Sequence, residues 1–183
     1  MENENRDKSF STEQYLTFKL GVEIFAIEIT KVREVIDFAG VTKVPGTPEY
    51  MRGVLNLRGS VVPVIDLQMK FGMGTTKKTV NTCVIIVEVP MEDGVTQLGA
   101  LADSVQEVVD LEQSQIEPPP RIGMNLRTEF IKGMGKSGDQ FIIILDIDKI
   151  FSEEELNIVE DIQGNSITAQ LAQNQESEES VVE

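Results

Sequence analysis

The body of the chain shows the short, alternating apolar patterns that are typical of β-strands. Leu16, Phe18 and Leu20 alternate with more polar neighbours, and Ile24–Ile29 forms a second apolar stretch beyond the turn-forming Gly21. Because only a few residues separate the two stretches, the pattern predicts a β-hairpin.

A second hairpin is predicted around Gly59. The apolar segments Val54–Leu57 and Val61–Ile65 flank this glycine, which can adopt the positive φ of a tight connection. Four further apolar runs predict strands, so the chain is expected to be mainly β. These runs are Cys83–Val89, Gln97–Leu101, Val105–Val109 and Gln140–Leu145.

The sequence contains an internal repeat. The segment Glu49–Gly53 recurs 80 positions later as Glu129–Gly133, and at the same spacing Asp66 matches Asp146. The segment KVREVIDF matches SVQEVVDL at a spacing of 73, so the order of the matches is preserved. The repeat predicts two related β units that share an apolar interface, because units of this size are marginal alone.

The repeat and the flanking composition divide the chain. We place the first β unit at about 14–71 and the second at about 81–151. The polar residues 1–13 are expected to be disordered, and so is the acidic tail, residues 164–183, because both segments bury too little apolar surface to offset chain entropy.

A short helix is expected before the acidic tail. Ser152 and Glu155 have the spacing of a capping box, and Leu156, Val159 and Ile162 recur at helical intervals. These features predict a C-terminal helix over residues 153–163.

Composition removes several function classes. The 183 residues carry a formal net charge of −15, which would repel nucleic acid and anionic membranes. The chain has no His and one Cys, so it lacks Ser-His catalysis, imidazole metal sites and intramolecular disulfides. No apolar run exceeds five residues, and the N-terminus lacks the pattern of a secretion signal, so a cytoplasmic protein without membrane insertion is expected.

The remaining candidates for chemistry have plain structural explanations. Asp66 and Asp146 each follow a predicted strand and precede a short helical segment, where an Asp side chain caps the helix. Cys83 opens an apolar strand and is expected to be a buried, inert thiol. The glycines match no phosphate-binding pattern, so no cofactor or metal is expected.

The run Gly53–Leu67, with the sequence GVLNLRGSVVPVIDL, resembles the signature segment of CheW-type chemotaxis coupling proteins. The segments Tyr15–Leu20, Val32–Val35 and Thr128–Gly133 also resemble family positions in family order, so the resemblance covers residues 14–156. It implies two SH3-like five-stranded β-barrel subdomains around a common core.

The resemblance also implies a function. Proteins of this family are non-catalytic adaptors that join the cytoplasmic tips of methyl-accepting chemoreceptors to the regulatory domain of the histidine kinase CheA. We therefore expect a protein that is monomeric alone and forms arrays with its partners.

Site residues follow from the same resemblance. Arg58 matches the signature Arg beside the receptor-binding groove, Ile29 and Val32 match its apolar lining, and Glu34 matches either this groove or a kinase contact. The kinase contacts are expected in the loops 41–45 and 116–122. The residues concerned are Val41, Lys43, Val44, Ile116, Glu117 and Ile122.

These two loops occupy similar places in the repeat but differ in charge. One carries Lys43, whereas the other carries Glu117, with Arg121 a few residues further on. Opposite charges would favour contacts between unlike ends, worth about 1 kcal/mol on an exposed rim.

Three alternative functions stay open at this point. The first is a small β-barrel enzyme that uses Asp and Lys alone. The second is a generic SH3-like adaptor for Pro-rich peptides, although the chain has no Trp and two Tyr to supply stacking surface. The third is a CheW-like scaffold in a non-flagellar pathway.

Overall fold

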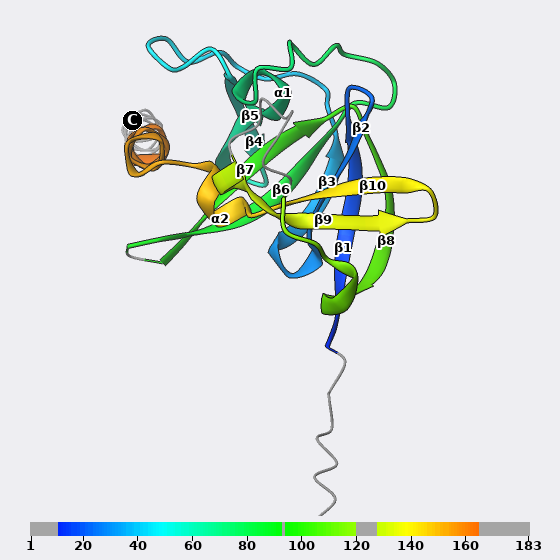
Figure 1. Cartoon of the computed structure of the whole chain (residues 1–183). Helices are drawn as coiled ribbons and strands as arrows, with labels where there is room; N and C mark the ends of the chain where they lie inside the picture. The colour runs from blue at the N-terminus through cyan, green and yellow to red at the C-terminus, as the bar shows by residue number, and fades with distance from the viewer. Residues whose placement is uncertain (1–10, 93, 120–127, 165–183) are drawn as a thin grey trace, which may run out of the picture.

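A computed structural model of the chain describes residues 11–92, 94–119 and 128–164. Ten strands, three 3-10 turns and short helices make up this part (Figure 1). Their bounds are β1 Thr12–Leu20, β2 Glu23–Glu28, η1 Ile29–Lys31, β3 Val32–Asp37, β4 Met51–Leu57, β5 Ser60–Asp66, α1 Leu67–Lys70, β6 Cys83–Met91, β7 Gly94–Ala102, β8 Ser104–Glu112, η2 Gln113–Gln115, η3 Thr128–Phe130, β9 Ile131–Ser137, β10 Gln140–Leu145 and α2 Ile147–Ile150. Residues 153–164 form the C-terminal helix.

The strands form two five-stranded sheets. Sheet A has the order β8-β1-β2-β10-β9, and sheet B has the order β3-β6-β7-β5-β4. Adding five to each strand number of β1–β5, and subtracting five from β6–β10, converts one order into the other. The two sheets are therefore built on the same plan, and the mainly β, two-subdomain architecture is confirmed.

Each sheet combines strands from both halves of the sequence. Strands β1 and β2 lie in sheet A with β8–β10, whereas β3–β5 lie in sheet B with β6 and β7. The expected first unit, residues 14–71, therefore does not make one sheet by itself. The sequence repeat could not reveal this exchange, because a spacing of matched residues does not say which strands pair.

The pairing register repeats together with the sequence. Met51 pairs with Ile65 in sheet B, and Ile131 pairs with Leu145 in sheet A, each 80 positions later. Both β4–β5 and β9–β10 have a register shift one step further on, before Gly53 and Gly133. The apolar runs predicted no strand at β3 or β9, and they predicted that β4 begins at Val54 rather than Met51. In these strands exposed or half-exposed residues interrupt the apolar pattern.

The expected barrels are open. Among the described residues, Thr42, which follows β3, makes an isolated bridge to Val54 of β4, and Glu117 makes the equivalent bridge to Met134 of β9. Gly53 and Gly133 lie against these bridging segments, where an added Cβ would stand 2.4 Å from the Thr42 carbonyl oxygen and 2.9 Å from that of Glu117. Glycine is therefore required where each sheet curls toward closure.

The central core lies between the two sheets. Leu16, Phe18 and Leu20 of β1 belong to this cluster, whereas Tyr15 on the opposite face of β1 belongs to a smaller cluster inside sheet A. Because the sheet curls, both faces of β1 are buried, and Tyr15 and Thr17 are not on a solvent face. Cys83 is also buried in the central core, as expected.

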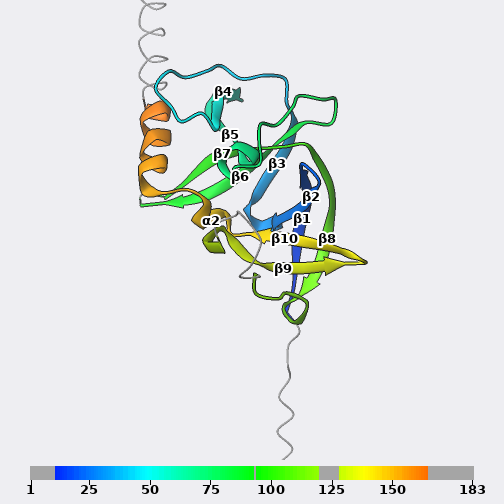
Figure 2. The ribbon, with the colours of Figure 1, turned by 45° about the horizontal axis from the view of Figure 1, so that its top comes forward.

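The C-terminal helix packs on sheet B (Figure 2). The capping box is confirmed, because the Glu155 N–H donates to Ser152 Oγ and the Ser152 N–H donates to a Glu155 carboxylate oxygen. Val159 is buried, and Gln163 bonds the Val61 carbonyl of β5 and the Thr96 hydroxyl of β7. The helix begins at 153 as expected and extends one residue further, to 164.

The capping predictions had different outcomes. The Asp66 carboxylate accepts hydrogen bonds from the N–H groups of Gln68 and Met69, which confirms the cap of α1. The prediction for Asp146 was wrong, because this residue stands at the N-cap of α2 but makes no side-chain capping bond. At the N-terminus, β1 begins at Thr12, two residues before the expected boundary.

Candidate functional site

The turn between β4 and β5 presents Arg58 at its tip. Both turn residues have positive φ, 49° for Arg58 and 86° for Gly59, and the Gly59 N–H donates to Asn56 Oδ1. Among the described residues, Arg58 is the one non-glycine residue with positive φ. Such a conformation costs about 1–2 kcal/mol in a non-glycine residue, and sites of this kind concentrate at functional positions.

Glu34 on β3 holds the Arg58 side chain. The two guanidinium nitrogens donate to the two carboxylate oxygens at 2.9 and 2.7 Å. This hydrogen bonding raises the pKa of Arg58 above its ordinary value. Because the Arg58 side chain is 74% exposed, the pair fixes the orientation of the guanidinium and adds little to stability.

The two apolar residues expected in the receptor-binding groove lie in η1 and at the start of β3, just before Glu34 in the chain. Ile29 is in η1 and Val32 opens β3, and both are half-buried against the central core. Of the four predicted receptor-binding residues, the structure joins Glu34 and Arg58 directly. The resemblance named both residues, but the ion pair between them depends on the fold.

The first predicted kinase-binding loop lies beside β4. Val41 is half-buried and lines a pocket with Ile36 and Leu55, whereas Lys43 is exposed and lines a separate pocket with Met51. Val44 is half-buried, and its carbonyl accepts a hydrogen bond from the Thr47 hydroxyl. This end of sheet B therefore presents an apolar surface with a cation at its rim.

The second predicted loop lies beside β9. Ile116 is half-buried against the core of sheet A, and Glu117 is exposed beside it. The matching bridges align Glu117 with Thr42, the residue directly before Lys43, so the two loops occupy similar places in the repeat. Ile122 and Arg121 lie outside the described residues.

A polar cluster that no sequence pattern predicted lies at the end of sheet A. Lys132 forms ion pairs with Glu28 and Glu13, and the Tyr15 hydroxyl donates to Glu13 at 2.8 Å. Burial lowers the pKa of Lys132, but its bonds with the carboxylates outweigh burial and raise the net pKa. The hydrogen bond from Tyr15 lowers the pKa of Glu13. Asp146 lies in the adjoining pocket. Its match to Asp66 in the repeat was the one sequence feature that could have drawn attention to this cluster.

Two other observations concern the described residues. Burial raises the pKa of the Cys83 thiol, as expected for a core residue. None of the helices in the described ranges has the length and apolar character needed to cross a membrane.

Comparisons with known proteins identify relatives over most of the chain. The model of the CheW-like domain matches residues 14–155. The chain is 37% identical over 150 residues to the chemotaxis protein CheW of Klebsiella aerogenes, covering 82% of this chain and 88% of that protein. It is 32% identical over 145 residues to the CheW of Treponema pallidum, covering 78% and 84%. The crystal structure of the scaffolding protein TtCheW from Thermoanaerobacter tengcongensis matches with a TM-score of 0.69 and 35% identity, covering 78% of this chain and 89% of that chain.

Proposed function

The chain belongs to the CheW-like domain family, and we propose that it joins the cytoplasmic tips of chemoreceptors to the regulatory domain of a histidine kinase in chemotaxis. That it is a chemotaxis coupling adaptor follows from the family match and the named relatives. The same matches favour this function over a generic peptide adaptor and over a non-flagellar scaffold. In this proposal the protein acts in the cytoplasm and catalyses no reaction.

The observation that carries the receptor side of the proposal is Arg58. A long cation on a strained two-residue turn, oriented by both oxygens of Glu34, is arranged for recognition, because the pair contributes little to stability. In the proposed complex, a receptor helix places its apolar stripe against Ile29 and Val32, and Arg58 fixes its position.

The kinase side uses the two ends of the molecule. Val41, Lys43 and Val44 form one contact, and Ile116, Glu117 and Ile122 form the other. Exposed charges of opposite sign, Lys43 and Glu117, support contacts between unlike ends.

Replacing Arg58 tests the receptor contact. Arg58→Ala is expected to weaken binding of a receptor-tip fragment by about 2 kcal/mol, because the anchoring cation is lost. Isothermal titration calorimetry measures this loss, and melting temperature and kinase binding should stay near wild type. The matched control is Arg33→Ala, which removes another exposed, ion-paired Arg of the same sheet. Loss of both partners, or an equal loss in the control, would contradict the proposal.

Replacing Lys43 tests the kinase contact. Lys43→Glu is expected to weaken binding of the kinase regulatory domain by about tenfold at low salt and by less at high salt, because exposed charges are screened. Sedimentation at two ionic strengths measures the difference, and Lys77→Glu, in the exposed linker, is the control. An equal loss at both ionic strengths would refute the electrostatic explanation.

A further inference from the structure

The two halves of the molecule contain the same strand-to-helix junction. Asp66 ends β5 before α1, and Asp146 follows β10 before α2, 80 positions later. The Asp66 N–H donates to the Tyr50 carbonyl at 2.7 Å, and the Asp146 N–H donates to the equivalent Phe130 carbonyl at 2.8 Å. The backbones of the two junctions are therefore held in the same way.

At the first junction, another segment of the chain fills the space in front of the acid. Thr76, in the linker after α1, donates both its backbone N–H and its hydroxyl to the Asp66 carboxylate, at 3.0 and 2.8 Å. Arg52 donates to the same carboxylate at 3.1 Å. Asp66 is consequently fully buried, and all of its hydrogen-bonding capacity is used within the fold.

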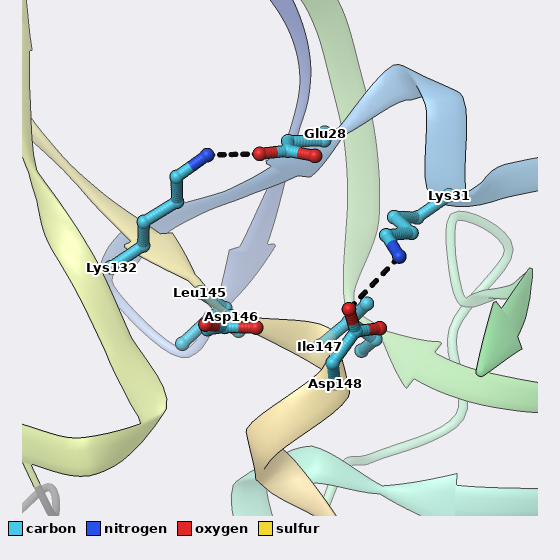
Figure 3. Close-up of a pocket in the computed structure, with 7 residues that line it drawn as sticks. All are labelled: Glu28, Lys31, Lys132, Leu145, Asp146, Ile147 and Asp148. Carbon is cyan, nitrogen blue, oxygen red and sulfur yellow. Dashed lines mark hydrogen bonds and ion pairs between the residues drawn. The ribbon is translucent and has the colours of Figure 1, made fainter. Parts of the chain in front are cut away.

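At the second junction, the corresponding space is an open pocket. Its volume is about 170 Å³, and the Asp146 side chain is 27% exposed. Figure 3 shows Asp146 between two ion pairs, Lys132 with Glu28 and Lys31 with Asp148. Lys132 is the counterpart of Arg52 in the repeat but pairs with Glu28 and Glu13 instead of Asp146.

The path of the chain explains the difference. After Phe71 the chain returns to its own junction and delivers Thr76 five residues later. After the equivalent Phe151 it enters the C-terminal helix, which packs against sheet B through Gln163. Within the described residues, no segment donates a backbone N–H or a hydroxyl to the Asp146 carboxylate as Thr76 does to that of Asp66.

The charges in the pocket indicate that it lacks hydrogen-bond donors for the Asp146 carboxylate. Lys31 and Lys132 are each paired with another carboxylate, and within the described residues the Asp146 carboxylate forms an ion pair with the exposed Lys149, at 3.7 Å. A carboxylate accepts several hydrogen bonds, so an occupant must bring donors rather than acceptors. The filled counterpart identifies donors that suit this geometry, namely the N–H and the hydroxyl of one residue.

We propose that the Asp146 pocket binds an extended peptide segment of a partner protein, which places the backbone N–H and hydroxyl of a Thr or Ser against the Asp146 carboxylate. The segment takes the place that Thr76 occupies at Asp66. The lining of this pocket includes neither Arg58 nor a residue of the two loops proposed to contact the kinase, but it includes Lys31, which lies between Ile29 and Val32 of the proposed receptor contact.

A peptide with the sequence of residues 73–78 of the chain, MGTTKK, is a direct probe. Added to the full-length, isotope-labelled protein at millimolar concentration, it is expected to shift the backbone NMR resonances of residues 146–148 in a saturable way. Replacing the second Thr of the peptide by Val removes the hydroxyl but keeps the shape. This change should weaken binding about tenfold, because a hydrogen bond to a charged group is lost.

Protein variants complete the test. Asp146→Ala should weaken peptide binding about tenfold or more, whereas Asp139→Ala, in the β9–β10 turn, removes the same charge outside the pocket and should leave binding unchanged. The proposal is overturned if the peptide shifts no resonance near Asp146, if the Val peptide binds equally well, or if Asp146→Ala binds like wild type. Arg58→Ala should bind the peptide normally, so failure of this site and failure of receptor coupling are distinguishable.

Discussion

Asp66 and Asp146 occupy equivalent positions in the two halves of the chain, but their surroundings differ. Asp66 is fully buried and accepts hydrogen bonds from Arg52, Thr76 and the first turn of α1. Asp146 faces a pocket and makes no capping bond. The backbone register is the same in both places, so the difference arises from the segment that follows each junction.

The basic residues of the two junctions differ in a related way. Arg52 donates to Asp66 and also to the Thr76 carbonyl at 3.3 Å, so one guanidinium nitrogen ties the linker to the junction. Lys132, 80 positions later, turns toward the carboxylates of Glu28 and Glu13. A planar guanidinium with several donors suits a site with several fixed acceptors, whereas an ammonium suits a cluster of carboxylates.

The largest expected effect is a stability difference between the two acids. Asp66→Ala should destabilise the protein by about 3–5 kcal/mol, because Arg52 and Thr76 lose a buried partner and α1 loses its cap. Asp146→Ala should change stability by about 0.5 kcal/mol or less. Urea denaturation measures both values. Equal losses would mean that Asp146 has a structural role that its contacts do not explain.

The two glycines beside the bridges give the next comparison. Gly53→Ala should cost about 2–3 kcal/mol, because Gly53 has a φ of 150° and the new Cβ would meet the Thr42 carbonyl oxygen at 2.4 Å. Gly133→Ala should cost less, because Gly133 has no positive φ and its nearest backbone atom, the Glu117 carbonyl oxygen, is further away, at 2.9 Å. Its other close neighbour, at 2.4 Å, is the Ile116 side chain, which can move. Urea denaturation ranks the two variants, and Gly138→Ala is a control for positive φ without a close neighbour. The reverse ranking would show that Ile116 cannot move.

The repeat made much of the architecture predictable from the sequence. A spacing of 80 residues aligned Glu49–Gly53 with Glu129–Gly133. The strands that begin in these segments, β4 and β9, pair with β5 and β10 respectively in the same register. The assignment of β1 and β2 to sheet A was not predictable, because it depends on parallel pairing of β2 with β10, more than 100 residues away. Local patterns predict the hairpins. The combination of strands from both halves of the sequence in each sheet depends instead on long-range packing.

The candidate site was also predictable only in part, because its residues are brought together by long-range packing. The family resemblance named Glu34 and Arg58, but the hydrogen bonds between them join β3 to the β4–β5 turn, which no local pattern indicates. The cap at Asp66 was predicted because capping is local. The same argument failed for Asp146, since the following segment and the neighbouring strands decide whether a carboxylate turns toward the helix.

The smallest expected effect concerns the two tyrosines, Tyr15 in β1 of sheet A and Tyr50 directly before β4 of sheet B. Burial and the hydrogen bond to Glu13 raise the pKa of Tyr15 from 10.0 to about 12, and burial with the hydrogen bond to Glu155 raises the pKa of Tyr50. Between about pH 10 and 12 the native state thus binds more protons than the unfolded state. The contribution of the tyrosines to the free energy of unfolding is therefore fully present below pH 10 and is lost as the pH rises toward 12.

Tyrosinate absorbance gives a clear test, because the chain has two Tyr and no Trp. In the folded protein neither tyrosine should ionise near pH 10, and tyrosinate should form near pH 12 or together with unfolding. Tyr15→Phe should reduce the dependence of unfolding free energy on pH in this range, since one of the two shifted groups is removed. A half-maximal tyrosinate signal at pH 10, in protein that still gives a native circular dichroism spectrum, would show that both tyrosines have ordinary pKa values and lie in more polar surroundings.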